Sequence, residues 1–241
     1  MIPALGARRS LRQAANWECA IMVSAVLNLM RTAYSRIRLA AELRQYNEYT
    51  IAEYLRKQGA EIGEGCSIIT RDLGPEPYLV KLGNHVTIAH GVIFMTHDGG
   101  AWLFRREFPD LQVFGPIVIE DNCVIGINAV LCPNIRIGPN SIVAAGSVVI
   151  SDVPPNTIAM GVPARPLGSI DRYREKCLER WNLQRPPGLV IEPGETWWNS
   201  KHLGSNREKL RRHLTALFRD QMGPSSSASS ALSNRPSDTT R

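Results

Sequence analysis

An aliphatic side chain recurs at every sixth position in the stretch between residues 117 and 149. These positions are Ile119, Ile125, Leu131, Ile137, Val143 and Val149. A period of six fits neither an α-helix, with a period of about 3.6, nor a half-buried strand, with a period of about two. It fits a solenoid in which three six-residue segments make one triangular coil and each aliphatic side chain points inward. Small residues at nearby positions, such as Gly126 and Ala129, are expected to let the chain turn at the corners.

The same pattern extends upstream with two interruptions. The coil is expected to begin at Ile62, to be broken by a Pro- and Gly-containing loop at residues 71–78, and to resume with Leu82, Ile88 and Phe94. The segment 97–117 does not keep the period, so we predict a loop that leaves the coil. Insertions of this kind tend to lie on the functional face of a solenoid.

The sequence on either side of the coil predicts helices. They are expected at residues 11–44, 50–58, 168–182 and 205–221. The first two would cover one open end of the solenoid, which otherwise exposes strand edges and apolar side chains. Residues 1–10 are predicted to be unstructured. Ser205 and Glu208 have the spacing of a capping box that would open the last helix.

Four segments follow from this pattern. They are an N-terminal helical cap (1–59), the β-coil domain (60–165, with the loop 97–117), a C-terminal helical extension (166–222) and a disordered tail rich in Ser, Ala, Pro and Thr (223–241).

The positive charge of the chain lies outside the coil. The formal net charge is +6, yet residues 60–165 contain six Lys or Arg against ten Asp or Glu. A nucleic-acid-binding protein normally concentrates basic residues on its recognition element, so this class is disfavoured. Five cysteines, without a CxxC motif, indicate a reduced, cytoplasmic chain.

An apolar run of 12 residues lies at positions 19–30. It is shorter than the roughly 20 residues needed to span a bilayer. Arg8, Arg9 and Arg12 precede it, as in a signal sequence, but no small-residue cleavage site follows, and a soluble helix is the favoured interpretation. Contact of this basic flank with a membrane surface stays open.

The run IEDNCVIGINAVLCPNIRIGPNSIVAAGSVV, followed by SDVPPNTIAMGVPAR, resembles the hexapeptide-repeat acyltransferases. Upstream, EPYLVKLGNHVTIAHGVIFMTHDGG is similar to the branch that O-acetylates sugars and capsular polysaccharide units. The resemblance covers about residues 52–173. It implies a mainly β fold, the left-handed parallel β-helix, in a homotrimer with active sites between subunits. It also implies acetyl-CoA as co-substrate and no metal.

His97 is the predicted catalytic residue. It lies at the root of the excluded loop, and the resembling family has its general base at this kind of position. A sugar hydroxyl is too weak an acid to attack a thioester unaided, and a neutral imidazole can accept its proton. A carboxylate should fix the tautomer of the ring, and both Glu76 and Asp98 are candidates. Asn84 is a candidate for acceptor binding.

The resemblance also implies the donor site. In the family, the pantetheine arm of coenzyme A meets backbone amides of the later coils, which corresponds here to Ala144, Ala145, Gly146 and Ser147. Arg165 matches a basic residue that meets a coenzyme A phosphate, and a guanidinium suits that anion. Gly126 is a candidate for the backbone N–H that meets the developing oxyanion. Val124 stands where many relatives carry Trp, a departure that affects the shape of the pantetheine channel.

The excluded loop offers side chains for an acceptor pocket. Sugar rings stack on aromatic side chains and charged sugars pair with arginine, so Trp102, Phe104, Arg105 and Arg106 are candidates. Alternatively, Trp102 and Phe104 only anchor the loop.

The favoured function is O-acetylation of a sugar or glycan precursor by direct attack. The nearest alternative is N-acylation of an amino sugar, which needs a base as well. A zinc enzyme of the γ-carbonic-anhydrase type is disfavoured, because His85 and His90 have its spacing but the wrong phase, and no third histidine precedes them. A non-catalytic scaffold would need neither the loop histidine nor the GVPAR sequence.

Overall fold

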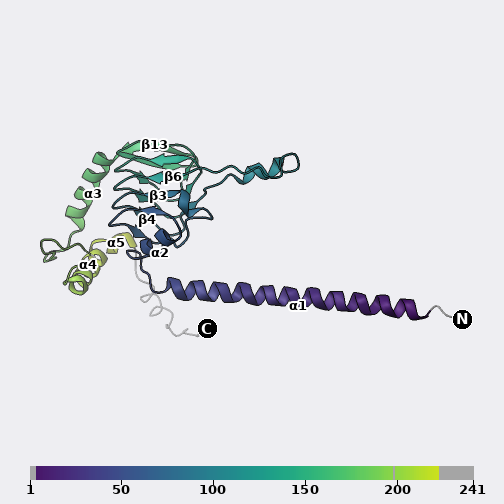
Figure 1. The fold of residues 1–241 in the computed structure, drawn as a ribbon. Helices are drawn as coiled ribbons and strands as arrows, with labels where there is room; N and C mark the ends of the chain where they lie inside the picture. The colour runs from purple at the N-terminus through teal and green to yellow at the C-terminus, as the bar shows by residue number, and fades with distance from the viewer. Residues whose placement is uncertain (1–3, 198, 223–241) are drawn as a thin grey trace, which may run out of the picture. The chain divides into compact units, whose positions relative to one another are not determined.

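A computed structural model describes residues 4–197 and 199–222 of the chain (Figure 1). The predicted disordered tail lies outside the described residues. The chain divides into two compact units, residues 1–170 and 171–241. The first unit contains helices α1 and α2 and all of the strands, and the second contains nearly all of α3 (Ile170–Gln184) together with α4 (Leu203–Leu217) and α5 (Arg219–Met222).

Short strands in the first unit form three sheets. The first sheet contains β1 (Glu61–Ile62), β3 (Val80–Leu82), β6 (Ile117–Ile119) and β9 (Ile135–Ile137). The second contains β2 (Ser67–Ile68), β4 (Thr87–Ile88), β7 (Val124–Ile125), β10 (Ile142–Val143), β12 (Thr157–Gly161) and β13 (Ala164–Ser169). The third contains β5 (Ile93–Phe94), β8 (Val130–Leu131) and β11 (Val148–Val149).

From β3 to β11 the chain visits the first, second and third sheets in turn, and every strand pair is parallel except β12 with β13. This is the topology of a parallel β-helix, and the stacked coils are visible in Figure 1. From β6 onward, Ile117 pairs with Ile135 and Val124 with Ile142, a step of 18 residues. One coil is therefore three six-residue segments, as the repeat predicts.

The periodic aliphatic residues form the core of this coil. All six, from Ile119 to Val149, are at most 1% exposed, and Leu82, Ile88 and Phe94 are buried with them. Helix α2 (Ile51–Lys57) packs Ile51 and Leu55 against the same core and so covers the first coil. It is followed by Gly59 at φ +104°, a left-handed residue that ends the helix.

The corners of the coil correct one expectation. The sharp turns depend on left-handed residues three positions after each aliphatic residue, namely Asn122, Asn128, Asn134, Asn140 and Gly146, at φ between +55° and +69°. Asn and Gly adopt this conformation at the lowest cost. The small residues have a different task, which is to let coils stack: a Cβ at Gly126 would lie 2.4 Å from the backbone nitrogen of Ala145.

Two helix predictions also need correction. Helix α1 (Ala4–Leu43) begins inside the segment that was expected to be unstructured. Ser205 does not open the last helix, because α4 begins at Leu203 after the N-cap residue His202. Glu208 instead binds Arg211 and Arg212, which lower its pKa to about 2. Within the described part of the chain, no helix is both long enough and apolar enough for a membrane span.

Candidate active site

The predicted loop leaves the coil after β5 and returns at β6. Its two limbs are joined at the root by an isolated antiparallel bridge between His97 and Phe114. The N–H of Gly115 donates to the carbonyl of Thr96 at 2.9 Å, and the N–H of Asp98 donates to Val113 at 2.8 Å. The ring of Phe114 also lies edge-on to the His97 ring, with centroids 6.3 Å apart. The backbone at His97 is therefore fixed although the rest of the loop extends outward.

Glu76 is the carboxylate that the structure brings to His97. Its Oε2 lies 3.0 Å from Nδ1 of the imidazole. The hydroxyl of Thr96, which is fully buried, donates to the same oxygen at 2.5 Å. The Glu76 side chain is 14% exposed, whereas that of His97 is 41% exposed. Glu76 is thus shielded from solvent, whereas the His97 ring is open to a substrate.

A glycine two residues earlier allows this approach. Gly74 has φ +88°, and a Cβ there would lie 2.7 Å from the carbonyl oxygen of Phe94 at the end of β5. Only a residue without a side chain lets the loop 71–78 lie this close to the strand that leads to His97. Neither Gly74 nor Thr96 was predicted as part of the site. Thr96 carries a weak signal, because it is a polar residue two positions after the inward Phe94 and so faces inward.

The lowered pKa of Glu76 indicates which ring nitrogen of His97 carries the hydrogen. Hydrogen bonds from Thr96 and then from His97 lower the pKa of Glu76 below its ordinary value, so the carboxylate stays ionised at neutral pH. An ionised carboxylate only accepts hydrogen bonds, so Nδ1 of His97 carries the hydrogen in this pair. In the neutral ring, Nε2 then has the free lone pair that a general base needs.

Asp98, the other candidate, has a different task. Its Oδ1 accepts a hydrogen bond from the N–H of Gly100 at 2.8 Å and so caps the short helix η2 (Gly99–Phe104). The structure therefore brings Glu76, and not Asp98, to the imidazole.

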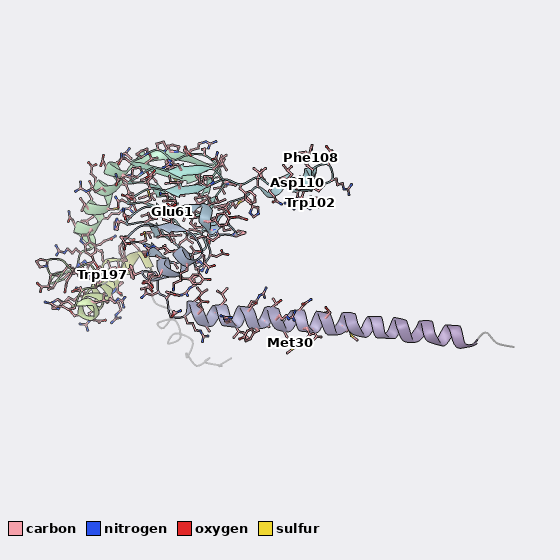
Figure 2. All side chains as sticks on the ribbon, in the orientation of Figure 1. Met30, Glu61, Trp102, Phe108, Asp110 and Trp197 are labelled. Atoms are coloured by element: carbon pink, nitrogen blue, oxygen red, sulfur yellow. The ribbon has the colours of Figure 1, made fainter. Side chains whose placement is uncertain are left out.

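The aromatic residues of the loop do not anchor it within one chain. Trp102 is 72% exposed and Phe104 is 51% exposed. Figure 2 shows Trp102 and Phe108 at the far end of the loop, away from the coil. Arg105 instead joins the two limbs, donating to Leu111 O at 3.4 Å and to Gln112 Oε1 at 3.0 Å. A single subunit therefore does not bring Trp102 or Arg105 to a closed acceptor pocket.

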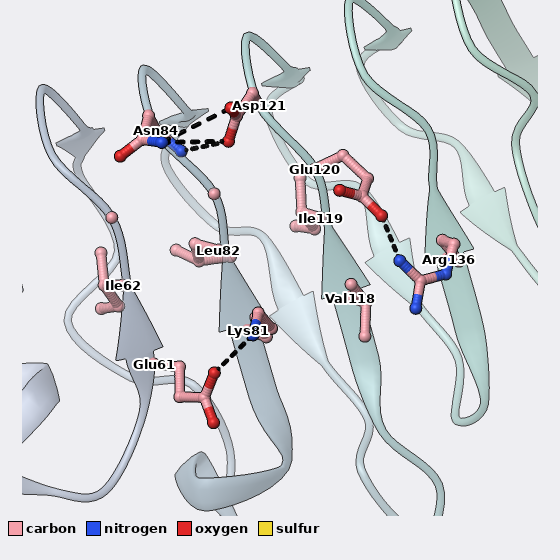
Figure 3. A pocket seen from close by; sticks show the side chains of 12 residues that line it. Glu61, Ile62, Lys81, Leu82, Asn84, Val118, Ile119, Glu120, Asp121 and Arg136 are labelled. Carbon is pink, nitrogen blue, oxygen red and sulfur yellow. Dashed lines mark hydrogen bonds and ion pairs between the residues drawn. The ribbon is translucent and has the colours of Figure 1, made fainter.

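Asn84 is engaged by the coil itself. It lies at the corner between the first and second sheets, whereas His97 follows the third. Its Oδ1 accepts from the N–H of Glu64 at 2.9 Å, and its own N–H donates to Asp121 at 2.7 Å (Figure 3). It borders a groove of about 520 Å³ on the first sheet, where Lys81 pairs with Glu61 at 2.7 Å and Arg136 pairs with Glu120. The chain alone does not unite Asn84 with His97.

The candidate donor residues lie at the corner between the second and third sheets. Most of their amides already serve the coil: Gly126 N–H donates to Val143 O at 2.8 Å, Ala144 N–H to Ala159 O at 2.9 Å, and Gly146 N–H to Ile127 O at 2.8 Å. The N–H of Ser147 donates to Ala144 O at 3.3 Å. Gly126 is therefore not available for an oxyanion, and coil stacking explains its missing side chain.

Ala145 and Gly146 give this corner an open surface. Both are exposed, and nothing lies within 4 Å of the Cβ position at Gly146. The N–H of Ala145 has no hydrogen-bond acceptor in the described part of the chain. Arg165 lies on β13, and its Nη1 donates to Ala164 O at 3.0 Å while the residue as a whole is exposed. Both places are open to solvent.

His85 and His90, which have the spacing of zinc ligands, do not form a metal site with other described residues. Nδ1 of His85 lies 2.7 Å from Oδ1 of Asn122, which continues through Asn140 to Asn156 as a ladder of side-chain hydrogen bonds. Among the described residues, no three His, Cys, Asp or Glu side chains lie close enough together to hold a metal ion.

The sequence of this chain is similar to those of known transferases. Residues 116–151 match the bacterial transferase hexapeptide family (six repeats). The chain is 48% identical to protein CapG of Staphylococcus aureus over 128 residues, which are 52% of this chain and 74% of that protein. The chain belongs to the hexapeptide-repeat acyltransferases. The predicted family and enzyme class, an acyltransferase, are thereby confirmed.

Two further relatives of this acyltransferase are named as an O-acetyltransferase and an N-acetyltransferase. Galactoside O-acetyltransferase of Escherichia coli is 36% identical over 96 residues, 40% of this chain and 47% of that protein. The 2,3,4,5-tetrahydropyridine-2,6-dicarboxylate N-acetyltransferase of Alkaliphilus metalliredigens is 55% identical over 77 residues, 32% of this chain and 31% of that protein. The chain thus spans less than half the length of these two relatives.

Proposed function

We propose that the chain transfers the acetyl group of acetyl-CoA to a hydroxyl of a sugar or glycan precursor, with His97 as general base. The observation that carries this proposal is the contact of 3.0 Å between Nδ1 of His97 and an ionised Glu76. The similarity to a galactoside O-acetyltransferase supports acetyl transfer to a sugar.

The chemistry needs one proton carrier. Nε2 of His97 accepts the hydroxyl proton as the sugar oxygen attacks the acetyl carbonyl carbon. The C–S bond of the thioester then breaks, and the imidazolium returns the proton to the leaving thiolate. Glu76 stabilises the cationic ring and keeps it oriented. No covalent enzyme intermediate is required.

The open corner at Ala145 and Gly146 would receive the pantetheine arm, and Arg165 a phosphate of coenzyme A. The third sheet lies between this corner and His97, so the acyl end would cross its outer face. This face is apolar, with Ile93, Val130 and Val148 pointing outward. Since the N–H of Gly126 is engaged, the N–H of Ala145 is the better candidate to bind the ligand.

A homotrimer with left-handed coils and active sites between subunits is the assembly that we propose. The half-exposed ring of His97 and the exposed apolar end of the loop support it, because both need a surface that one subunit lacks. A neighbouring subunit would also supply the acceptor contacts expected of Trp102, Arg105 and Asn84.

The test is release of free thiol from acetyl-CoA against a panel of sugars, nucleotide sugars and amino sugars. His97→Ala should lower kcat by about 10²- to 10⁴-fold. Asp98→Asn is the matched control, since it retains a cap for η2 and lies outside the pair, and it should keep most of the activity. Wild-type turnover in His97→Ala would remove this residue from the mechanism.

N-acylation of an amino sugar is the second candidate, favoured by the similarity to an N-acetyltransferase. An amine acceptor also loses a proton to a base, so His97 does not separate the two reactions. The product does: an ester is cleaved by mild alkali and an amide is not. Absence of both turnover and coenzyme A binding would favour a scaffold.

A further inference from the structure

Helix α1 has an apolar face that no residue in the described part of the chain covers. Met22, Val26, Leu29, Met30 and Ile37 fall on one side at helical spacing, and each is between 54% and 71% exposed. The opposite side is polar, with Asn28, Arg31, Ser35, Arg38 and Glu42 at steps of three and four residues. The helix is therefore amphipathic along this stretch, which Figure 2 marks with Met30.

The charge on this helix is predominantly positive. Between residues 19 and 41 there are three arginines and no acidic residue, and residues 1–44 contain seven arginines against two glutamates. Such a helix attracts an anionic surface and is repelled by a basic one.

The helix is not apolar enough for a perpendicular crossing, since no described helix has a stretch that is both long and apolar enough to span a bilayer. An amphipathic helix with a cationic polar side instead lies in the plane of the membrane interface.

A coiled coil with a second copy fits the pattern less well. If Met30 and Ile37 formed the seam, the positions beside it would be Leu27, Leu29, Tyr34 and Arg36. These positions normally carry opposite charges that pair between helices, but here they offer no acid, and the apolar stripe is wider than a seam.

We propose that α1 binds the surface of a membrane that contains anionic lipids, with its apolar side in the interface and its arginines at the headgroups. This goes beyond acetyl transfer and does not depend on it. It places the acyltransferase at a membrane surface, where a membrane-held acceptor would be within reach.

The experiment is flotation of the full chain with two kinds of vesicle, pure phosphatidylcholine and phosphatidylcholine mixed with phosphatidylglycerol. Binding is expected only to the mixed vesicles and should weaken with salt. Replacing three cations (Arg31→Gln, Arg36→Gln, Arg38→Gln) should lower the apparent affinity by roughly 100-fold, since each basic residue near an anionic surface contributes about fivefold. The apolar variant Leu29→Gln with Met30→Gln should also lose binding.

A matched control changes three cations of α3 (Arg174→Gln, Lys176→Gln, Arg180→Gln) and should bind as the wild type does. Equal loss in this control would overturn the assignment to α1, as would absence of wild-type binding to either vesicle. Loss of self-association in the apolar variant, without vesicle binding by the wild type, would assign the face to a second copy instead. Circular dichroism checks that each variant is folded, and thiol release with a soluble acceptor should be unchanged in all of them.

Discussion

One carboxylate oxygen holds the candidate base in place. Oε2 of Glu76 receives both the Thr96 hydroxyl and Nδ1 of His97, so the orientation of the ring depends on a residue 21 positions away in sequence. The sequence predicts His97 from its place beside the excluded loop. It leaves Glu76 and Asp98 open, because the choice depends on how closely the loop 71–78 approaches β5, and Gly74 decides that distance.

Thr96→Val tests this arrangement at the level of one hydroxyl. The volume stays nearly constant while the largest cause of the lowered Glu76 pKa disappears, so that pKa should rise toward its ordinary value of 4.5. Loss of a hydrogen bond to a charged group should lower kcat/KM by roughly tenfold.

The pH dependence of unfolding gives a second readout for Thr96→Val. A carboxylate with a lowered pKa contributes stability above its unfolded pKa and loses it as the pH falls through its folded pKa. The stability difference between wild type and variant should therefore be largest above about pH 4.5 and shrink in more acidic solution. A difference that stays constant with pH would show that the hydroxyl acts through packing alone.

At the scale of the element, the six-residue period predicts burial well and backbone conformation poorly. Every periodic aliphatic residue is buried, because a period of six points each of these side chains into the narrow triangular core. The recurrence of Asn122, Asn128, Asn134 and Asn140 is equally regular in the sequence, but its meaning depends on φ, which hydrophobicity does not report. Gly126, directly after the periodic Ile125, reflects contact with Ala144 in the next coil, 18 residues later, which local propensity cannot reveal either.

Gly126→Ala measures how tightly the coils stack. The added Cβ would meet backbone atoms of Ala144 and Ala145 at 2.4–2.9 Å, and neither can move without displacing a strand. Such overpacking should lower the free energy of unfolding by about 1–3 kcal/mol. Gly168→Ala is the control, because nothing lies within 4 Å of its Cβ position and its φ is not positive. Urea denaturation of both variants checks the prediction, and equal stability would contradict the role of close stacking.

At the scale of the whole molecule, one subunit holds an incomplete site. It fixes His97 and Glu76 but leaves Trp102, Phe104 and Phe108 exposed on the loop. Exposed apolar groups of this size are expected to bind another surface. The sequence predicts the loop but not its contacts, because these depend on how separate coils associate.

Mixing two inactive variants tests whether neighbouring subunits share a site. One variant lacks the base (His97→Ala). The other keeps the full loop but lacks two of its aromatic side chains (Trp102→Ala with Phe104→Ala). If the loop of one subunit completes the site of the next, trimers reassembled from equal amounts of both variants contain some intact sites. A site is intact where a subunit with His97 adjoins a subunit with the native loop, which random closed assembly gives in about a quarter of interfaces. Thiol release should therefore recover to about a quarter of wild type after mixing and unfolding–refolding, while each variant treated alone stays inactive. Activity that does not recover would mean that the loop serves its own subunit, and the apolar side chains at its end would then need a partner other than this chain.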